Sequence, residues 1–373
     1  MDLAEMRRLL LSVAAGLAIT GTALLLARRT ETASTLVAAL VPSGLTAAEM
    51  SGQRLGAKIV PDPVLPDRSL RITGERDDSA AGLRGMRPPP ADRKPLPSET
   101  VSRSAEERGG VNPCERPDPG YGIYTEWQYR SAFGRVIMPR QNPVDSQGRF
   151  DLLAQFHGAD LARLEFVRGD APFVFMAVHQ GKGGSYAALS GANALPILLR
   201  SLERTMASES PTGKAHAEHV ALSSWSAGFG GIKRILQRSE GLDRISAVVL
   251  LDSLHMSRDE RVGAARLAPF IEFAQRAVRG EALMFVSYSS IMTDRFASTT
   301  ESVRLLISEL GGNPLPAEGD GPGGLQLKEV YSQGNFHARG YLGGGKLDHC
   351  AHLLLMPEVA KALQRYWHPV GSE

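Results

Sequence analysis

The chain has 373 residues, of which 43% are hydrophobic and 22% charged, and its formal net charge is +2. This composition is typical of a globular protein with one large domain and extensions. No period of 20 to 50 residues is visible, so the sequence predicts neither a solenoid nor a propeller. No long basic stripe with interleaved aromatic residues is present, so the sequence predicts no nucleic-acid partner.

The N-terminus carries an uncharged apolar run. Leu9 to Ala27 is 19 residues long, and two arginines stand on each side of it. The run is long enough to span a bilayer, is long for a signal-peptide core, and ends without a clear cleavage site. Residues 1–30 are therefore predicted to be a signal anchor, with a cleaved signal peptide or a buried helix as alternatives. Arginines at both ends leave the orientation open, although a single N-terminal anchor more commonly places the rest of the chain outside the cytoplasm.

Residues 31–118 have the composition of a low-complexity, Pro-rich tether. Prolines recur at positions 61, 63, 66, 88–90, 95 and 97, and charges of both signs are mixed with Ser and Gly. Such a segment buries too little apolar surface to offset the entropy lost on ordering it. We expect an extended, semi-rigid connection between the membrane and the domain that follows.

From about residue 119 the sequence alternates strand and helix patterns. The predicted strands cover 130–138, 150–156, 173–178, 220–222, 245–251, 283–286 and 325–331. The predicted helices cover 159–167, 194–206, a segment ending at 237, 267–278, 300–310 and 349–367. This alternation predicts an α/β domain over 119–373, with a doubly wound, mostly parallel sheet and helices on both faces.

The most informative segment is HVALSSWSAGFGGIKRIL, residues 219–236. A short apolar run is followed by Ser224-Trp225-Ser226-Ala227-Gly228 and then by helical apolar spacing. This is the order of a nucleophile elbow, a strained turn between strand and helix, with Ser224 in place of the usual first glycine. Small residues are needed two positions to either side of the nucleophile, and Ser224 and Gly228 meet that need. The alternative is an ordinary buried strand that enters a helix through a Ser/Gly turn.

From these residues and their order, the domain resembles the α/β-hydrolase superfamily. In that superfamily an oxyanion loop follows an early strand, and the elbow, an acid and a histidine follow in that chain order. Here Gln155-Phe156-His157-Gly158 ends an early strand, and Ser226, Asp252 and the His349 region come next. The resemblance implies that Ser226 attacks an acyl carbonyl. It also implies that the backbone N–H groups of Ala227 and of Gly158 or Ala159 form the oxyanion hole.

Two roles in this constellation have competing candidates. The base is His349, at the predicted entrance of the last helix, or His352, one turn further on. The acid is Asp252, which directly follows a buried strand, or Asp294, which lies in a later loop. We favour Asp252 because a triad acid must be rigid and buried to hold the imidazole tautomer.

The resulting hypothesis is a serine hydrolase of a carboxylic ester or similar acyl compound, with no cofactor. The alternative is a catalytically inactive α/β-hydrolase-like binding or scaffold module on a membrane anchor. Metal binding is not predicted, because neither the His349/His352 pair nor the His216/His219 pair has a further ligand at matching spacing. The expected partners are a small acyl substrate and, through the N-terminal helix, the membrane; the domain is expected to lie outside the cytoplasm or to be exported. The sequence leaves the oligomeric state open.

The chain has only two cysteines, Cys114 and Cys350. An extracytoplasmic location is compatible with a disulfide between them, which would join the end of the tether to the last helix beside His349. The alternative is that both thiols are free, because sequence separation does not show whether the two Cα atoms come close enough.

Overall fold

The structure is a computed structural model that describes residues 71–72, 103–131, 133–178, 186–257, 259–294 and 296–369. The predicted signal anchor lies outside these residues. None of the helices in the described ranges combines the length and the apolar character needed to span a bilayer.

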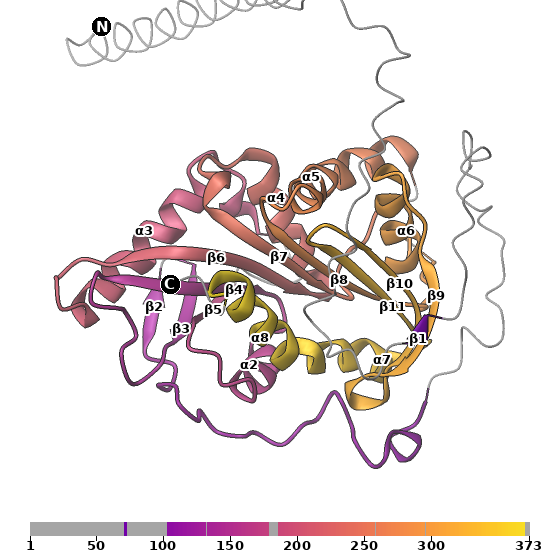
Figure 1. Ribbon diagram of the computed structural model, residues 1–373, viewed down its shortest axis with the longest axis horizontal. Coiled ribbons are helices and arrows are strands. Elements are labelled where there is room, and N and C mark those ends of the chain that lie inside the picture. The colour runs from indigo at the N-terminus through magenta and orange to yellow at the C-terminus, as the bar shows by residue number, and fades with distance from the viewer. Residues whose placement is uncertain are drawn as a thin grey trace, which may run out of the picture. The chain divides into compact units, whose positions relative to one another are not determined.

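Eleven strands in the described residues form one sheet in the order β1-β9-β10-β11-β8-β7-β6-β4-β5-β3-β2 (Figure 1). Six consecutive strands in the middle run parallel: β11 (Phe336–Leu342), β8 (Leu283–Ser289), β7 (Ile245–Leu251), β6 (His216–Trp225), β4 (Arg149–Phe156) and β5 (Val174–Val178). Antiparallel strands extend the sheet at both edges: β3 (Gly134–Ile137) and β2 (Tyr129–Ser131) on one side, and β10 (Gln326–Gln333), β9 (Leu315–Asp320) and β1 (Arg71–Ile72) on the other.

Helices cover both faces of this sheet, as the sequence predicts. One face carries α3 (Ala194–Met206), α4 (Phe229–Arg238), α5 (Glu260–Val278) and α6 (Thr299–Glu309). The other carries α2 (Ala159–Val167), α7 (Lys346–Ala351) and α8 (Met356–Trp367). In Figure 1 the first group lies above the strands and the second below.

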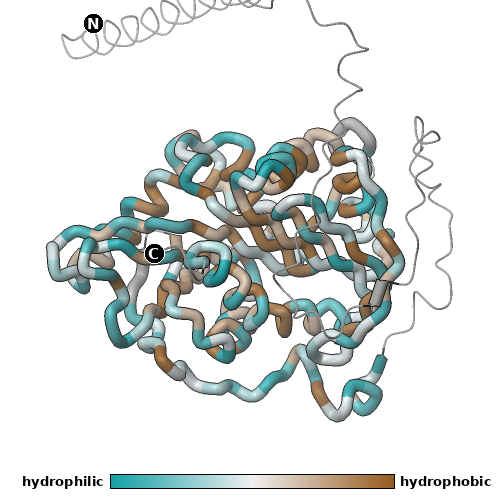
Figure 2. Tube along the Cα trace, in the orientation of Figure 1, coloured by the Kyte–Doolittle hydropathy of each residue, from teal (hydrophilic) through white to brown (hydrophobic). Residues whose placement is uncertain are grey.

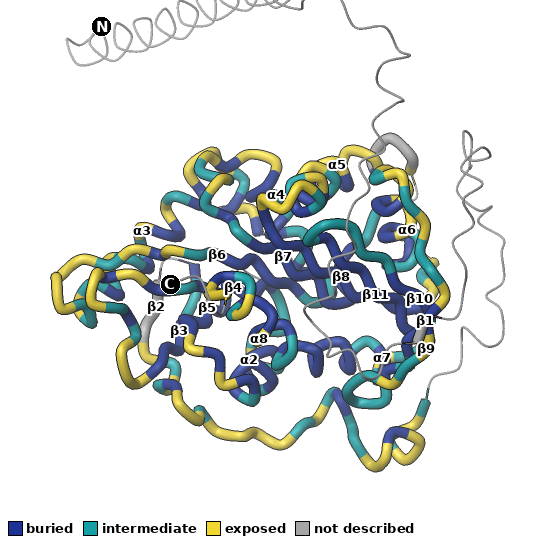
Figure 3. The backbone as a smooth tube through the Cα atoms, viewed as in Figure 1, coloured by how far each residue is buried: buried dark blue, intermediate teal, exposed yellow. Residues whose placement is uncertain are grey.

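The two faces have separate hydrophobic cores because side chains alternate along each strand. In β4, Leu152 and Ala154 join one core while Leu153 joins the other. Strands buried on both sides therefore read as continuous apolar runs. Figure 2 shows these runs in the central strands, and Figure 3 shows that the same strands are buried while the outer loops are exposed.

Three sequence predictions of elements need correction. The predicted strand 130–138 is a hairpin, β2 and β3, that turns at Phe133. The predicted final strand 325–331 is β10, and β9 and β11 flank it. The predicted helix 349–367 consists of α7, a 3₁₀ turn over His352–Leu355, and α8, which has Pro357 in its first turn. A proline is accepted at the start of a helix but interrupts its interior, so a new helix begins there.

Part of the region predicted as a tether contacts the domain. The two residues of β1 pair with β9, and the Arg103 guanidinium donates to the carbonyl of Gly324 at 2.9 Å. Arg108 forms a buried ion pair with Asp348 in α7. The domain boundaries at residues 30 and 118 remain predictions.

Candidate active site

The turn after β6 has the backbone geometry of a nucleophile elbow. Ser226 has φ +55°, a strained value for a non-glycine residue, and a 3₁₀ turn over Ser226–Gly228 leads directly into α4. A Cβ at Gly228 would clash with the carbonyl of Phe156. At the other small position, Ser224 is fully buried, and its hydroxyl lies 2.7 Å from the hydroxyl of Ser253. Both positions two residues from Ser226 therefore require small side chains.

The loop after β4 lies against this elbow. His157 and Gly158 both have positive φ, and Gly158 is the N-cap of α2. A Cβ on Gly158 would lie 2.5 Å from the ring of Trp225, the residue that precedes Ser226. The first backbone N–H groups of a helix have no acceptor within the helix. In α2 these N–H groups follow Gly158 and therefore lie beside the elbow.

Asp252 follows β7 directly, with φ +45° and only 2% of its surface exposed. Its carboxylate accepts hydrogen bonds from the backbone N–H of Ser289 at 3.0 Å, the Ser289 hydroxyl at 3.0 Å and the Thr299 hydroxyl at 2.6 Å. It also lies 2.6 Å from Nδ1 of His349. The carboxylate is thus buried, rigid and fully hydrogen-bonded.

The electrostatics of this pair depend on burial and on hydrogen bonding. Burial by itself would raise the pKa of the Asp252 carboxyl, but the neighbouring His352 and hydrogen bonds from His349 and Thr299 hold this pKa well below its ordinary value. Burial lowers the pKa of His352 to about 4, against the opposing charge of Asp252, so His352 is neutral at pH 7. At that pH the hydrogen bonds are therefore what keeps the carboxylate charged.

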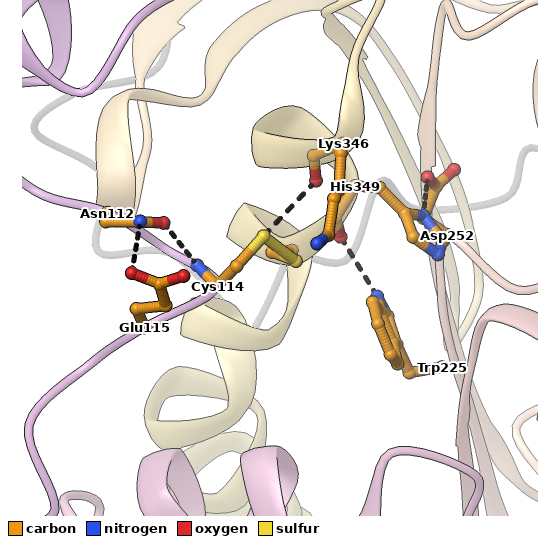
Figure 4. The surroundings of a disulfide bond; sticks show 8 residues. Asn112, Cys114, Glu115, Trp225, Asp252, Lys346 and His349 are labelled. Atoms are coloured by element: carbon orange, nitrogen blue, oxygen red, sulfur yellow. Dashed lines mark hydrogen bonds and ion pairs between the residues drawn. A yellow bond between two sulfur atoms is a disulfide. The ribbon is translucent and has the colours of Figure 1, made fainter.

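His349 is oriented from two sides. Its Nδ1 faces Asp252, and its ring stacks on Trp225 with 4.6 Å between the ring centroids. The Trp225 indole N–H also donates to the His349 carbonyl at 2.9 Å (Figure 4). Ser226 is linked to Asp252 through Ser253, the residue after Asp252. The Ser253 hydroxyl donates to the Ser226 carbonyl at 2.8 Å. Among the described residues, no hydrogen bond joins the Ser226 hydroxyl to His349.

The other two candidates lie in different environments. His352 is fully buried, with Nδ1 2.8 Å from the hydroxyl of Ser287, and it makes no hydrogen bond to Asp252 in the described structure. Asp294 is exposed in the loop after β8. The structure thus brings His349 and Asp252 into a hydrogen bond. His352 lies near this pair but bonds to Ser287 instead, and Asp294 lies on the surface.

Four features lie at the carboxyl ends of strands in the parallel part of the sheet. They are the Ser226 turn after β6, the His157–Gly158 loop after β4, Asp252 after β7 and His349 after β11. The fold is α/β-hydrolase-like.

Comparisons with known proteins find remote structural likenesses only. No family model matches the chain, and no curated protein matches it. A bacterial heroin esterase is 13% identical, with a TM-score of 0.35, over 65% of this chain and 86% of its own. An IroE-like serine hydrolase from Shewanella oneidensis is 12% identical, with a TM-score of 0.33, over 62% and 75%. A thermostable esterase from Pseudomonas putida is 10% identical, with a TM-score of 0.35, over 72% and 90%. The fold assignment therefore depends on the strand order and the elbow of this α/β-hydrolase-like domain.

The N-terminal segment fixes the helix that carries His349. Cys114 and Cys350 form a disulfide with Cα atoms 5.2 Å apart, and the Cys114 sulfur lies 3.6 Å from the Lys346 carbonyl (Figure 4). On the other side of His349, Asp348 accepts hydrogen bonds from the backbone of Gly344 and Gly345 and pairs with the buried Arg108. Both sequence neighbours of His349 are therefore fixed by contacts with the segment that precedes the domain.

Sequence reasoning missed the residues that support the site. Trp225 lies inside the elbow motif, but nothing in the local sequence indicates that it contacts His349. Thr299 follows Ser298, whose capping box with Glu301 marks the start of α6 in the sequence S-T-T-E. Neither pattern shows that Thr299 reaches Asp252, because that contact spans 47 residues.

Proposed function

We propose that the protein is a serine hydrolase that cleaves a carboxylic ester or a similar acyl compound. The observation that carries the proposal is the buried, hydrogen-bonded Asp252 at 2.6 Å from His349, one strand away from the strained turn at Ser226. A buried carboxylate bonded to Nδ1 fixes the imidazole tautomer that leaves Nε2 free to accept a proton.

In the proposed mechanism, His349 removes the proton of the Ser226 hydroxyl as the oxygen attacks the acyl carbonyl. The charge that develops on the carbonyl oxygen is stabilised by the backbone N–H of Ala227 and by that of Gly158 or Ala159. His349 then protonates the leaving alcohol, and an acyl-enzyme forms on Ser226. Water, activated by the same imidazole, releases the acid and restores the serine. Catalytic hydrogen bonds are often longer before substrate binds, so the serine–histidine bond belongs to the substrate complex.

The alternative, an inactive binding module, has the same fold but does not need a reactive serine. Ser226 favours the hydrolase, because a strained backbone conformation at a non-glycine residue beside an aspartate–histidine pair is typical of functional sites. A module without chemistry gains nothing from a strained serine beside such a pair.

The test is covalent labelling by a fluorophosphonate probe, which reacts with activated serines, together with hydrolysis of short p-nitrophenyl esters. We expect labelling of the full chain at Ser226 and loss of both signals in Ser226→Ala. Removal of a triad nucleophile costs on the order of 10⁶ in kcat. Ser208→Ala, at an exposed position in the turn after α3, is the matched control and should keep both signals. Absence of labelling in the folded wild-type chain would favour the binding module.

We further propose that the N-terminal apolar run holds the hydrolase at a membrane, with the domain outside the cytoplasm. The Cys114–Cys350 disulfide supports this location, because such bonds persist in oxidising compartments. Protease accessibility of the domain in intact cells tests it. Digestion only after the membrane is permeabilised would contradict it.

A further inference from the structure

A second cluster of titratable side chains lies near the amino ends of the parallel strands, at the opposite end from Ser226. Asp151 is the third residue of β4, and His219, its partner in the strand register, is the fourth residue of β6. His368 follows the last residue of α8. Ser226 lies seven positions after His219, just beyond the end of β6, which corresponds to roughly 20 Å along an extended strand. This cluster is therefore separate from the candidate active site.

The three side chains converge on one point. Nδ1 of His219 lies 2.8 Å from one carboxylate oxygen of Asp151, and Nε2 of His368 lies 2.6 Å from the other. The ligand atoms that the three residues offer all lie within 4.8 Å of one another. The two imidazole rings meet edge to face, with their centroids 5.5 Å apart.

Two imidazole nitrogens and one carboxylate oxygen are the ligands that zinc prefers. Tetrahedral zinc with bonds of about 2.0–2.2 Å places its ligand atoms roughly 3.3 Å apart, so the cluster must open by about half an ångström to admit the ion. His368 provides this freedom, because its side chain is 56% exposed and lies at the end of the last helix. Its exposure also leaves room for water as the fourth ligand.

Aromatic packing holds His219 in place, whereas the side chain of His368 is exposed. The His219 ring stacks almost parallel on Trp367, with 5.4 Å between the centroids and an interplanar angle of 9°. Trp367 is in turn fixed by a hydrogen bond from its indole N–H to the Ser246 hydroxyl at 3.0 Å. The nearby Arg149 guanidinium is paired with Asp145 at 2.8 Å and also interacts with Glu218 and Asp151, so carboxylates already offset its positive charge beside the cluster.

We propose that Asp151, His219 and His368 bind a divalent transition-metal ion of the zinc class. The ion would close the end of α8 onto β4 and β6, and its distance from Ser226 gives it a structural role. Both cysteines are in the disulfide, so thiolates do not compete for the ion.

The test measures Zn²⁺ binding to the untagged full chain by calorimetry after treatment with EDTA. We expect one Zn²⁺ per chain, and we expect the melting temperature to rise on addition of Zn²⁺. His368→Ala, at an exposed position that leaves the fold intact, should weaken binding by at least about tenfold and abolish the rise in melting temperature. His216→Ala is the matched control, because His216 is equally exposed in β6 and contacts Glu203 instead of Asp151. This control should bind Zn²⁺ as the wild type does.

Wild-type affinity in His368→Ala, or no stoichiometric binding in the wild type, would overturn the proposal. Loss of binding in His216→Ala alone would also overturn it, by moving the ion to the surface pair of His216 and Glu203. Co²⁺ gives a second readout, since the intense visible absorption of a tetrahedral site should appear in the wild type and disappear in Asp151→Asn. Ester hydrolysis should be unchanged in every one of these variants.

Discussion

Removal of the Cys114–Cys350 disulfide should both destabilise the domain and slow catalysis. The bond joins residues 236 positions apart, and the chain-entropy relation for a loop of this length gives about 5.5 kcal/mol of stabilisation at 25 °C. Native-state strain and residual structure in the unfolded chain usually reduce such values, so we expect a loss of about 2–5 kcal/mol.

Cys114→Ala is the informative variant. It breaks the bond at a half-buried position but leaves the buried Cys350 in place, so that no cavity forms in α7. Unfolding in guanidinium chloride without reductant measures the change in the free energy of unfolding. The catalytic effect follows from position: Cys350 is the residue after His349, and small displacements of a catalytic group cost up to about 10²-fold in rate. We expect kcat/KM for a short ester to fall by about 10- to 100-fold at a temperature well below unfolding.

A loss of less than about 1 kcal/mol in Cys114→Ala would refute the loop-closure argument, because that value lies below the usual range for a native disulfide. A normal loss of stability with unchanged kcat/KM would refute the argument that the bond positions His349. Wild-type protein under a reducing agent should behave as the variant does, which separates loss of the bond from the effect of the substitution itself.

Three further outcomes are expected. Asp252→Asn should lower kcat about 10⁴-fold because an amide cannot hold the imidazole tautomer, whereas Asp294→Asn should leave steady-state ester hydrolysis unchanged. The pKa of His352 is about 4 in the folded chain and 6.5 when unperturbed, so the unfolded chain binds the extra proton between these values. Lowering the pH from 6.5 to 4 should therefore cost up to about 3 kcal/mol of unfolding free energy, and denaturation series should show a flatter pH dependence in His352→Gln. Gly158→Ala places a Cβ 2.5 Å from the Trp225 ring at a positive φ, so it should lower both the melting temperature and the activity; wild-type values for both would contradict the close approach.

The local pattern of apolar residues was sufficient to predict many of the central strands and helices. The parallel strands β4, β5, β7 and β8 are apolar runs in the sequence because each is buried on both faces. The elbow was also readable, since the strain at Ser226 requires small residues at fixed offsets. Edge strands carry a weaker signal, because one side faces solvent and their pairing depends on residues far away in the chain. For this reason β9 was missed, and the hairpin of β2 and β3 was taken for one strand. β11 is an interior strand, but it was missed because the buried polar residues His337 and Arg339 interrupt its apolar run.

The sequence by itself determined the candidates and their chain order, because strand, turn and helix signals depend on neighbours within a few residues. Only the tertiary structure decided which candidates meet. It pairs His349 with Asp252 and gives His352 to Ser287, although the two histidines are three positions apart. It also joins Cys114 to Cys350 across 236 residues, and it brings His368 to Asp151 across 217. Contacts of this range depend on how the helices pack on the sheet, and no spacing within the chain encodes that packing.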